Sequence, residues 1–165
     1  MSDEHTMHAS TVGNGRGQSV YPENRVAILV DCDNTIPAML DHALRMVAQF
    51  GRVVIRRGYG NYETLGHRWQ EALVQQGFTP HLQYQYASGK NTADIALALD
   101  ALEAMFDQRA DMFCLVTSDS DFAYLCRKLR ERGATVCVVG AAKTLPPCAM
   151  RVTISLSGRA SDGRN

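Results

Sequence analysis

Two uninterrupted apolar runs, each followed by carboxylates, constrain the fold of this chain most strongly. Residues 26–30 are all apolar and lead directly into Asp31, and a second run within residues 112–117 leads to Asp119 and Asp121. Runs without alternation are typical of parallel strands, because helices cover both faces of a parallel sheet. The sequence therefore favours an α/β protein whose central strands end in acidic residues.

Helical and strand patterns alternate along the rest of the chain. We expect further strands at residues 52–56, 78–86 and 135–139, and helices at residues 37–50, 64–76, 93–106 and 122–132. In the helix at 93–106, Ile95, Leu99, Leu102 and Phe106 share one face, which is the pattern of a helix packed on a core. This βαβαβαβαβ order predicts a five-stranded parallel sheet with helices on both faces.

The charge balance limits how the chain could hold a polyanion. Seventeen basic residues face 17 acidic ones, which gives a formal net charge of zero. A domain that grips nucleic acid by overall charge is usually strongly basic. Any basic surface on this protein must therefore be local.

Composition also suggests a compartment and domain boundaries. No apolar run reaches the length of a membrane span, and the polar N-terminus lacks the apolar stretch of a signal peptide. The five cysteines show no paired metal-ligand spacing, which favours reduced thiols in the cytoplasm over a zinc site. We expect a disordered tail at residues 1–24, one domain at residues 25–143, and a disordered tail at residues 144–165.

The acidic residues are predicted to meet at one edge of the sheet. Ligands of such sheets bind at the carboxyl ends of the strands, where Asp31, Asp119 and Asp121 would lie. Asp94 opens the helix at 93–106 and adds a further carboxylate. Crowded carboxylates repel one another unless a cation neutralises them, and hard oxygen ligands suit Mg²⁺ or Mn²⁺.

Each of these residues also has an ordinary structural interpretation. Asp33 and Asn34 could form a turn after the strand, and Asp94 could be a first-turn carboxylate favoured by the helix dipole. Asp121 could help to cap the helix that follows it. Asp31 is hardest to explain in this way, because it directly follows five buried residues.

Four segments of the chain resemble the motifs of the NYN domain family, the LabA-like members of the PIN-like nuclease superfamily. They are LVDCDN at 29–34, YGNY at 59–62, GKNTADIAL at 89–97 and TSDSDF at 117–122. The resemblance covers residues 26–143. It implies a three-layer α/β/α, Rossmann-like domain with strand order 3-2-1-4-5 and a metal-dependent ribonuclease activity.

The resemblance also implies roles for individual residues. Asp31, Asp94, Asp119 and Asp121 match the acidic positions that bind the metal and act in catalysis. Metal-activated water would attack the phosphorus of RNA and leave a 5′-phosphate and a 3′-hydroxyl. RNA is the implied partner, and a homodimer is compatible with the family.

Substrate contacts are expected around this cluster. Lys90 could hold the scissile phosphate or be an ordinary solvated lysine, and the tyrosines could stack on bases or simply be strand residues. The backbone N–H of Ser118 lies near a helix entrance, where phosphate is favoured. The predicted substrate-binding residues are Asn34, Asn61, Lys90, Ser118, Arg57 and Tyr59.

Two rival functions fit parts of the sequence. Asp31, Asp33 and Thr35 match the first motif of haloacid-dehalogenase-type phosphatases, in which the first aspartate is a nucleophile. Those enzymes need a later lysine followed by an acidic pair, and no such pair follows Lys128 or Lys143. The other rival is a catalytically weak or inactive module of the same fold that binds RNA or a partner.

The C-terminal end departs from the family pattern. Similar family members continue after residue 144 with a helix that contains Asn-Ala-Cys-Asp, whereas this chain reads LPPCAMRVTI at 145–154. We hypothesise a frameshift near Leu145, since permissible codons for this segment encode Asn-Ala-Cys-Asp in another frame. Coding DNA that is incompatible with that string would refute the hypothesis.

Overall fold

The computed structural model describes residues 24–84 and 92–141 and the backbone of a last strand at 150–155. The strands are β1 Arg25–Asp31, β2 Arg52–Gly60, β3 Thr79–Leu82, β4 Met112–Val116, β5 Thr135–Ala141 and β6 Met150–Ser155. The helices are α2 Ala38–Val47, α3 Gln70–Gln75, α4 Thr92–Phe106 and α5 Ala123–Glu131. None of these described helices is long and apolar enough to cross a bilayer. The N-terminal tail expected at 1–24 lies almost entirely outside the described residues.

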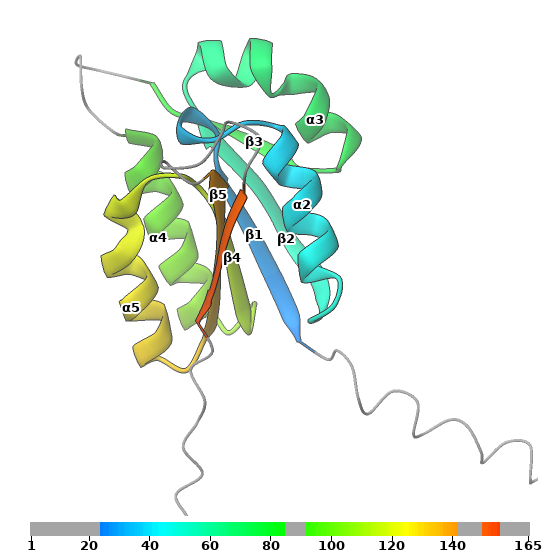
Figure 1. Ribbon diagram of the computed structural model, residues 1–165. Coiled ribbons are helices and arrows are strands. Elements are labelled where there is room, and N and C mark those ends of the chain that lie inside the picture. The colour runs from blue at the N-terminus through cyan, green and yellow to red at the C-terminus, as the bar shows by residue number, and fades with distance from the viewer. Residues whose placement is uncertain (1–23, 85–91, 142–149, 156–165) are drawn as a thin grey trace, which may run out of the picture.

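The strands form one sheet in the order β3-β2-β1-β4-β5-β6, and the first five are parallel (Figure 1). This confirms the predicted five-stranded parallel arrangement with order 3-2-1-4-5. β1 lies between β2 and β4, with Asp31 opposite Tyr59 and Val30 opposite Val116. The strand order therefore reverses at β1, and the two acidic segments of the sequence follow neighbouring strands.

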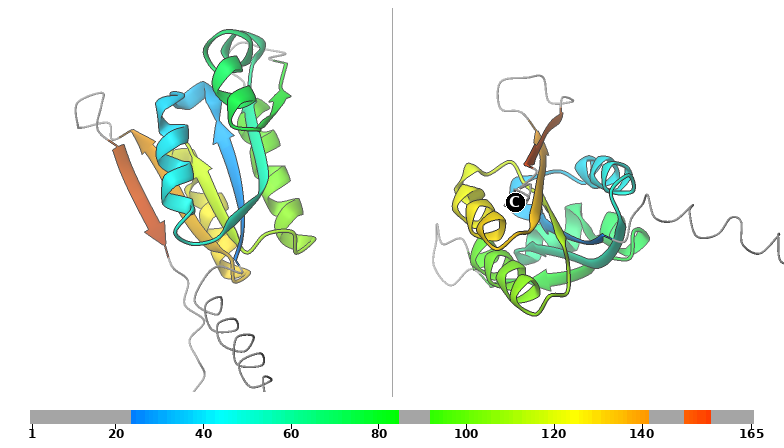
Figure 2. Two further views of the ribbon diagram at one scale, coloured as in Figure 1. Left: turned by 90° about the vertical axis from the view of Figure 1, so that its right-hand side faces the viewer. Right: turned by 90° about the horizontal axis from the view of Figure 1, so that it is seen from below.

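Helices cover both faces of the sheet, with α4 and α5 on one side and α2 and α3 on the other (Figures 1 and 2). Successive residues of β1 therefore pack into two different cores, which explains why the strand is apolar throughout. The first, here called the α2 core, includes Val26, Ile28, Met39, Leu40 and Trp69. The second, here called the α4 core, includes Ala27, Leu29, Leu97, Phe113 and Leu129.

The sheet has one strand that the sequence analysis did not expect. β6 pairs antiparallel with β5, from Ala141 opposite Met150 to Val136 opposite Ser155, at the edge of the sheet shown in Figure 2. It lies within residues 144–165, where we expected a disordered tail. The segment Met150–Ser155 alternates apolar and polar residues, which is the period of an edge strand with only one buried face.

Helix α4 packs on the sheet with a different face from the one expected. Its buried residues are Ala93, Leu97, Ala101 and Ala104. The side chains of Ile95, Leu99 and Phe106 are 60%, 61% and 58% exposed, so for these three the expected core face is wrong. Small alanines let the helix backbone approach the sheet closely, and the bulkier residues are left on the outer side.

Candidate metal centre at the carboxyl edge of the sheet

Asp31 is a buried carboxylate at the last position of β1, with a relative exposure of 1%. Its Oδ2 accepts hydrogen bonds from Thr117 Oγ1 at 2.8 Å and from Asn34 Nδ2 at 3.1 Å. Its Oδ1 is buried and has no hydrogen-bond partner among the described residues. Burial raises the pKa of Asp31, and the two hydrogen bonds oppose that rise.

Three carboxylates from different parts of the chain converge at this point. Oxygen atoms of Asp31, Asp94 and Asp119 all lie within 4.8 Å of one another. Asp31 ends β1, Asp94 lies in the first turn of α4, and Asp119 follows β4. The fold therefore brings together three of the four acidic residues that the sequence analysis singled out.

The carboxylates of this cluster repel one another. Burial, followed by the charges of Asp31, Asp119, Asp33 and Asp121, raises the pKa of Asp94 to about 7. A carboxylate surrounded by others holds its proton more tightly, and a cation among them would remove this effect. The electrostatics of the cluster thus favour a bound positive ion.

Asp119 is oriented by backbone contacts on both sides. Its own N–H donates to Thr117 Oγ1 at 3.0 Å, and its Oδ1 accepts the N–H of Asp121 at 2.9 Å. Asp121 itself is exposed and lies outside the group of three ligand atoms. Its described effect on the site is electrostatic, through the pKa of Asp94, and its role as a metal ligand stays a prediction.

Thr117 connects two of the carboxylates, because its hydroxyl donates to Asp31 and accepts from the N–H of Asp119. Its N–H donates to Val139 O at 2.9 Å, and β5 passes so close that a Cβ on Gly140 would lie 2.1 Å from Thr117 O. Only glycine fits at this close approach. The sequence analysis named Thr117 only as part of the segment TSDSDF and gave it no role at the site, because that role depends on the pairing of β1 with β4.

The turn after β1, Cys32–Asn34, is fixed by contacts that use several predicted substrate residues. Trp69 Nε1 donates to Cys32 O at 2.9 Å, and Asn34 O accepts the N–H of Ser118 at 3.0 Å. The N–H of Ser118 that we expected to meet phosphate is therefore used inside the site. The Asn34 side chain likewise donates to Asp31.

The second loop of the site is organised by Asn61. Its N–H donates to Asp33 Oδ1 at 3.1 Å, and its side-chain Oδ1 accepts the N–H of Thr64 at 2.9 Å. Asn61 therefore joins the turn after β1 to the π-helical turn Thr64–Arg68. A direct contact of Asn61 with substrate stays a prediction.

The remaining predicted substrate residues lie in different surroundings. Tyr59 is fully buried, and its hydroxyl donates to Asp100 Oδ2 at 2.6 Å, so its ring cannot stack on a base as expected. Arg57 pairs with the same carboxylate at 3.3 Å and remains partly exposed. Lys90 lies outside the described residues.

The donor set fits a hard divalent cation. Asp31, Asp94 and Asp119 offer carboxylate oxygens, which are preferred ligands of Mg²⁺ and Mn²⁺. The buried Oδ1 of Asp31 receives no donor from the residues that the structure describes, and a cation would satisfy it. These three residues form an acidic cluster that could hold a metal ion.

Comparison with known proteins agrees with this geometry. The chain is 34% identical over 123 residues to the uncharacterized protein MJ0482 of Methanocaldococcus jannaschii. The aligned segment makes up 72% of this chain and 48% of that protein. This chain therefore spans about half the length of that relative. It also resembles the crystal structure of a protein of unknown function, VPA0982 from Vibrio parahaemolyticus, with a TM-score of 0.55 and 25% identity over 72% of this chain and 82% of that one. The model of the NYN domain matches residues 25–155, including β6, and the chain thus belongs to the NYN domain family.

Proposed function

We propose that this protein is a metal-dependent ribonuclease that cleaves RNA phosphodiester bonds at Asp31, Asp94 and Asp119. The observation that carries the proposal is the buried Oδ1 of Asp31, which receives no donor within residues 24–84 and 92–141 and lies beside two further carboxylates. Membership of the NYN domain family, a PIN-like nuclease family, supports the same chemistry. RNA as substrate, and Mg²⁺ or Mn²⁺ as cofactor, are parts of this proposal.

The residues of the cluster and their neighbours would have different roles in holding the ion. Asp31, Asp94 and Asp119 would hold the ion, with Asp121 contributing negative charge beside them. When bound, Mg²⁺ or Mn²⁺ supplies an activated water and neutralises charge that develops on the phosphate. Thr117 and Asn34 keep Asp31 in one orientation, so its free Oδ1 stays directed at the ion position.

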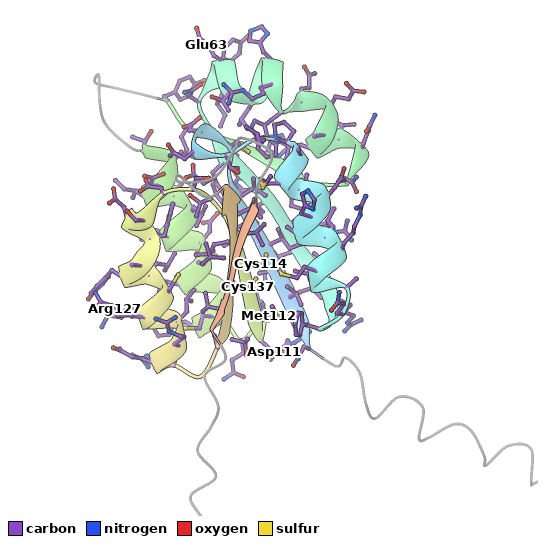
Figure 3. All side chains as sticks on the ribbon, in the orientation of Figure 1. Glu63, Asp111, Met112, Cys114, Arg127 and Cys137 are labelled. Atoms are coloured by element: carbon purple, nitrogen blue, oxygen red, sulfur yellow. The ribbon has the colours of Figure 1, made fainter. Side chains whose placement is uncertain are left out.

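The proposal places the activity in the cytoplasm. Cys32, Cys114, Cys126 and Cys137 are buried and free, and Figure 3 marks Cys114 and Cys137 within the sheet. A reducing compartment keeps such thiols in this form.

The test is cleavage of a labelled single-stranded RNA with Mg²⁺ or Mn²⁺, comparing the wild-type protein with Asp31→Asn. The substitution keeps the size of the side chain and removes the buried charge that organises the ion. We expect the rate to fall by about two orders of magnitude or more. Addition of a chelator should abolish wild-type cleavage.

Asp107→Asn is the matched control, because it makes the same chemical change at an exposed position just after α4. It should cleave at the wild-type rate. Equal cleavage by Asp31→Asn and Asp107→Asn would refute the proposed site. RNA binding without cleavage by the wild-type protein would favour a binding module over an enzyme.

A further inference from the structure

The protein carries a local basic groove on a molecule with no net charge. The groove has a volume of about 370 Å³. Its lining residues are Val54, Ile55, Arg56, Arg57, Thr79, His81 and Arg109. Three of these seven are arginines and none is acidic, which is the kind of local basic surface that the balanced composition requires for binding a polyanion.

The groove lies on the α4 side of the sheet, between strands β2 and β3 and the segment that follows α4. Ile55 and Tyr59 of β2 belong to the α4 core, so Arg57 between them points to the same side. Thr79 of β3 lies opposite Arg57, and His81 lies opposite Tyr59 with ring centroids 5.1 Å apart. The strand pattern therefore directs polar side chains into the groove from two neighbouring strands.

The guanidinium groups of the groove are only partly neutralised. Arg57 pairs with Asp100 at 3.3 Å, and Arg56 donates from Nη1 to the neutral Gln76 O at 2.8 Å. Arg109 is exposed just beyond α4. The Arg56 guanidinium thus lies toward α3 on the other face of the sheet, which leaves Arg57 and Arg109 with one paired carboxylate on the α4 side. Planar guanidinium groups suit the oxygens of phosphate.

Tyr59 and helix α4 connect the strands that line the groove with the candidate metal centre. Tyr59, whose hydroxyl shares Asp100 with Arg57, lies directly opposite Asp31 in the sheet. Helix α4 starts at the metal centre and ends beside the groove, and its length from Asp94 to Phe106 is about 18 Å. A strand stacked at about 3.4 Å per nucleotide would cover this distance with about five nucleotides.

We propose that this groove binds the sugar-phosphate backbone of the RNA strand that leads away from the scissile phosphate. The inference rests on the proposed ribonuclease function and assigns the path of its substrate. Arg109 and Arg57 would contact phosphates several nucleotides from the point of cleavage. The protein would then hold longer RNA more tightly than a dinucleotide, which reaches only the metal centre.

The experiment measures binding of a fluorescent single-stranded RNA of about twelve nucleotides, which exceeds the span of the groove. All proteins carry Asp31→Asn, so that binding is measured without cleavage. Arg109→Glu is compared with Arg127→Glu, which makes the same charge change on the outer side of α5 (Figure 3). We expect Arg109→Glu to weaken binding about tenfold and to reduce the salt dependence by about one phosphate contact. Arg127→Glu should change affinity less than about twofold.

Other results would decide against the proposal that the groove binds RNA, or would separate it from the proposed nuclease activity. Equal weakening by both variants would mean that only overall charge matters, and no effect of Arg109→Glu would place the RNA elsewhere. Metal-dependent cleavage by the wild-type protein, together with no effect of Arg109→Glu on RNA binding, would keep the nuclease and refute the groove. Binding that depends on Arg109 in a protein that never cleaves RNA would support the groove and refute the nuclease.

Discussion

Two donors hold one oxygen of Asp31, while its other oxygen receives none. Leaving a buried carboxylate oxygen without a partner is costly in a protein interior. The sequence indicates Asp31 because a carboxylate directly after a buried strand is unusual. Its partner Thr117 lies 86 positions away, and its role follows only once β1 and β4 are known to be neighbours.

Asp94 gives the metal-free protein a distinctive pH dependence. Its pKa rises from 3.8 to about 7 on folding, so the folded state binds a proton more tightly than the unfolded chain. Stability is therefore highest below about pH 4 with respect to this group, and it falls as the pH rises to about 7. We expect the melting temperature, measured with a chelator, to decrease across this range.

The Asp94→Asn variant isolates this contribution. Without the carboxyl group, the decrease in melting temperature between pH 4 and pH 7 should become smaller than in the wild-type protein. Mg²⁺ or Mn²⁺ should raise the melting temperature of the wild-type protein more at pH 7 than at pH 5, because the ion competes with the proton. The same slope in both proteins would contradict a raised pKa at Asp94.

At the scale of the element, helix α4 shows where periodicity misleads. Its apolar residues occupy two faces, and the sheet takes the face with Ala93, Leu97, Ala101 and Ala104. Hydrophobicity alone favours the larger residues. The close distance between helix and sheet, which selects the smaller ones, is a property of the packed structure.

Two leucines of α4 therefore should respond very differently to truncation. Leu97 is 1% exposed in the α4 core, and Leu97→Ala should lower the free energy of unfolding by about 2–5 kcal/mol. Leu99 is 61% exposed, and Leu99→Ala should change it by no more than about 0.5 kcal/mol. Urea denaturation measures both, and a larger loss for Leu99→Ala would contradict the observed orientation of the helix.

The strands show what sequence can and cannot predict at this scale. The central strands β1 and β4 were predictable because residues buried on both faces form apolar runs that need no partner to be recognised. β6 was not predicted, because Met150–Ser155 is a short stretch of alternating apolar and polar residues and not a continuous apolar run. The acidic cluster was predictable from the positions of strand ends, whereas burial of Tyr59 depended on contacts with α4.

On the scale of the whole molecule, the two cores share the strands at the centre of the sheet. Alternate residues of β1 and β4 enter the α2 core and the α4 core, as with Cys114 and Phe113. If either core lost its packing, one face of the central strands would be exposed to solvent, and these same strands carry the residues of the other core. The described domain should therefore unfold as one cooperative unit.

Trp69 makes this cooperativity measurable, because it is the single tryptophan of the chain and is fully buried in the α2 core. Its fluorescence and the far-ultraviolet circular dichroism should show the same transition in urea. Leu97→Ala, a change in the opposite core, should shift both transitions equally. Separate midpoints for the two signals would show that the two faces unfold independently.

Over generations, mutation acts differently on the three carboxylates than on the residues around them. Without a cation, the charges of Asp31 and Asp119 add to the effect of burial in raising the pKa of Asp94. Replacing any one of the three carboxylates therefore reduces the repulsion between the other two. Drift under selection for a stable fold alone would therefore erase this cluster sooner than it erased Leu97 or Trp69. A lineage that kept the domain only as scaffolding would therefore be expected to lose these acids before it lost the residues of the two cores.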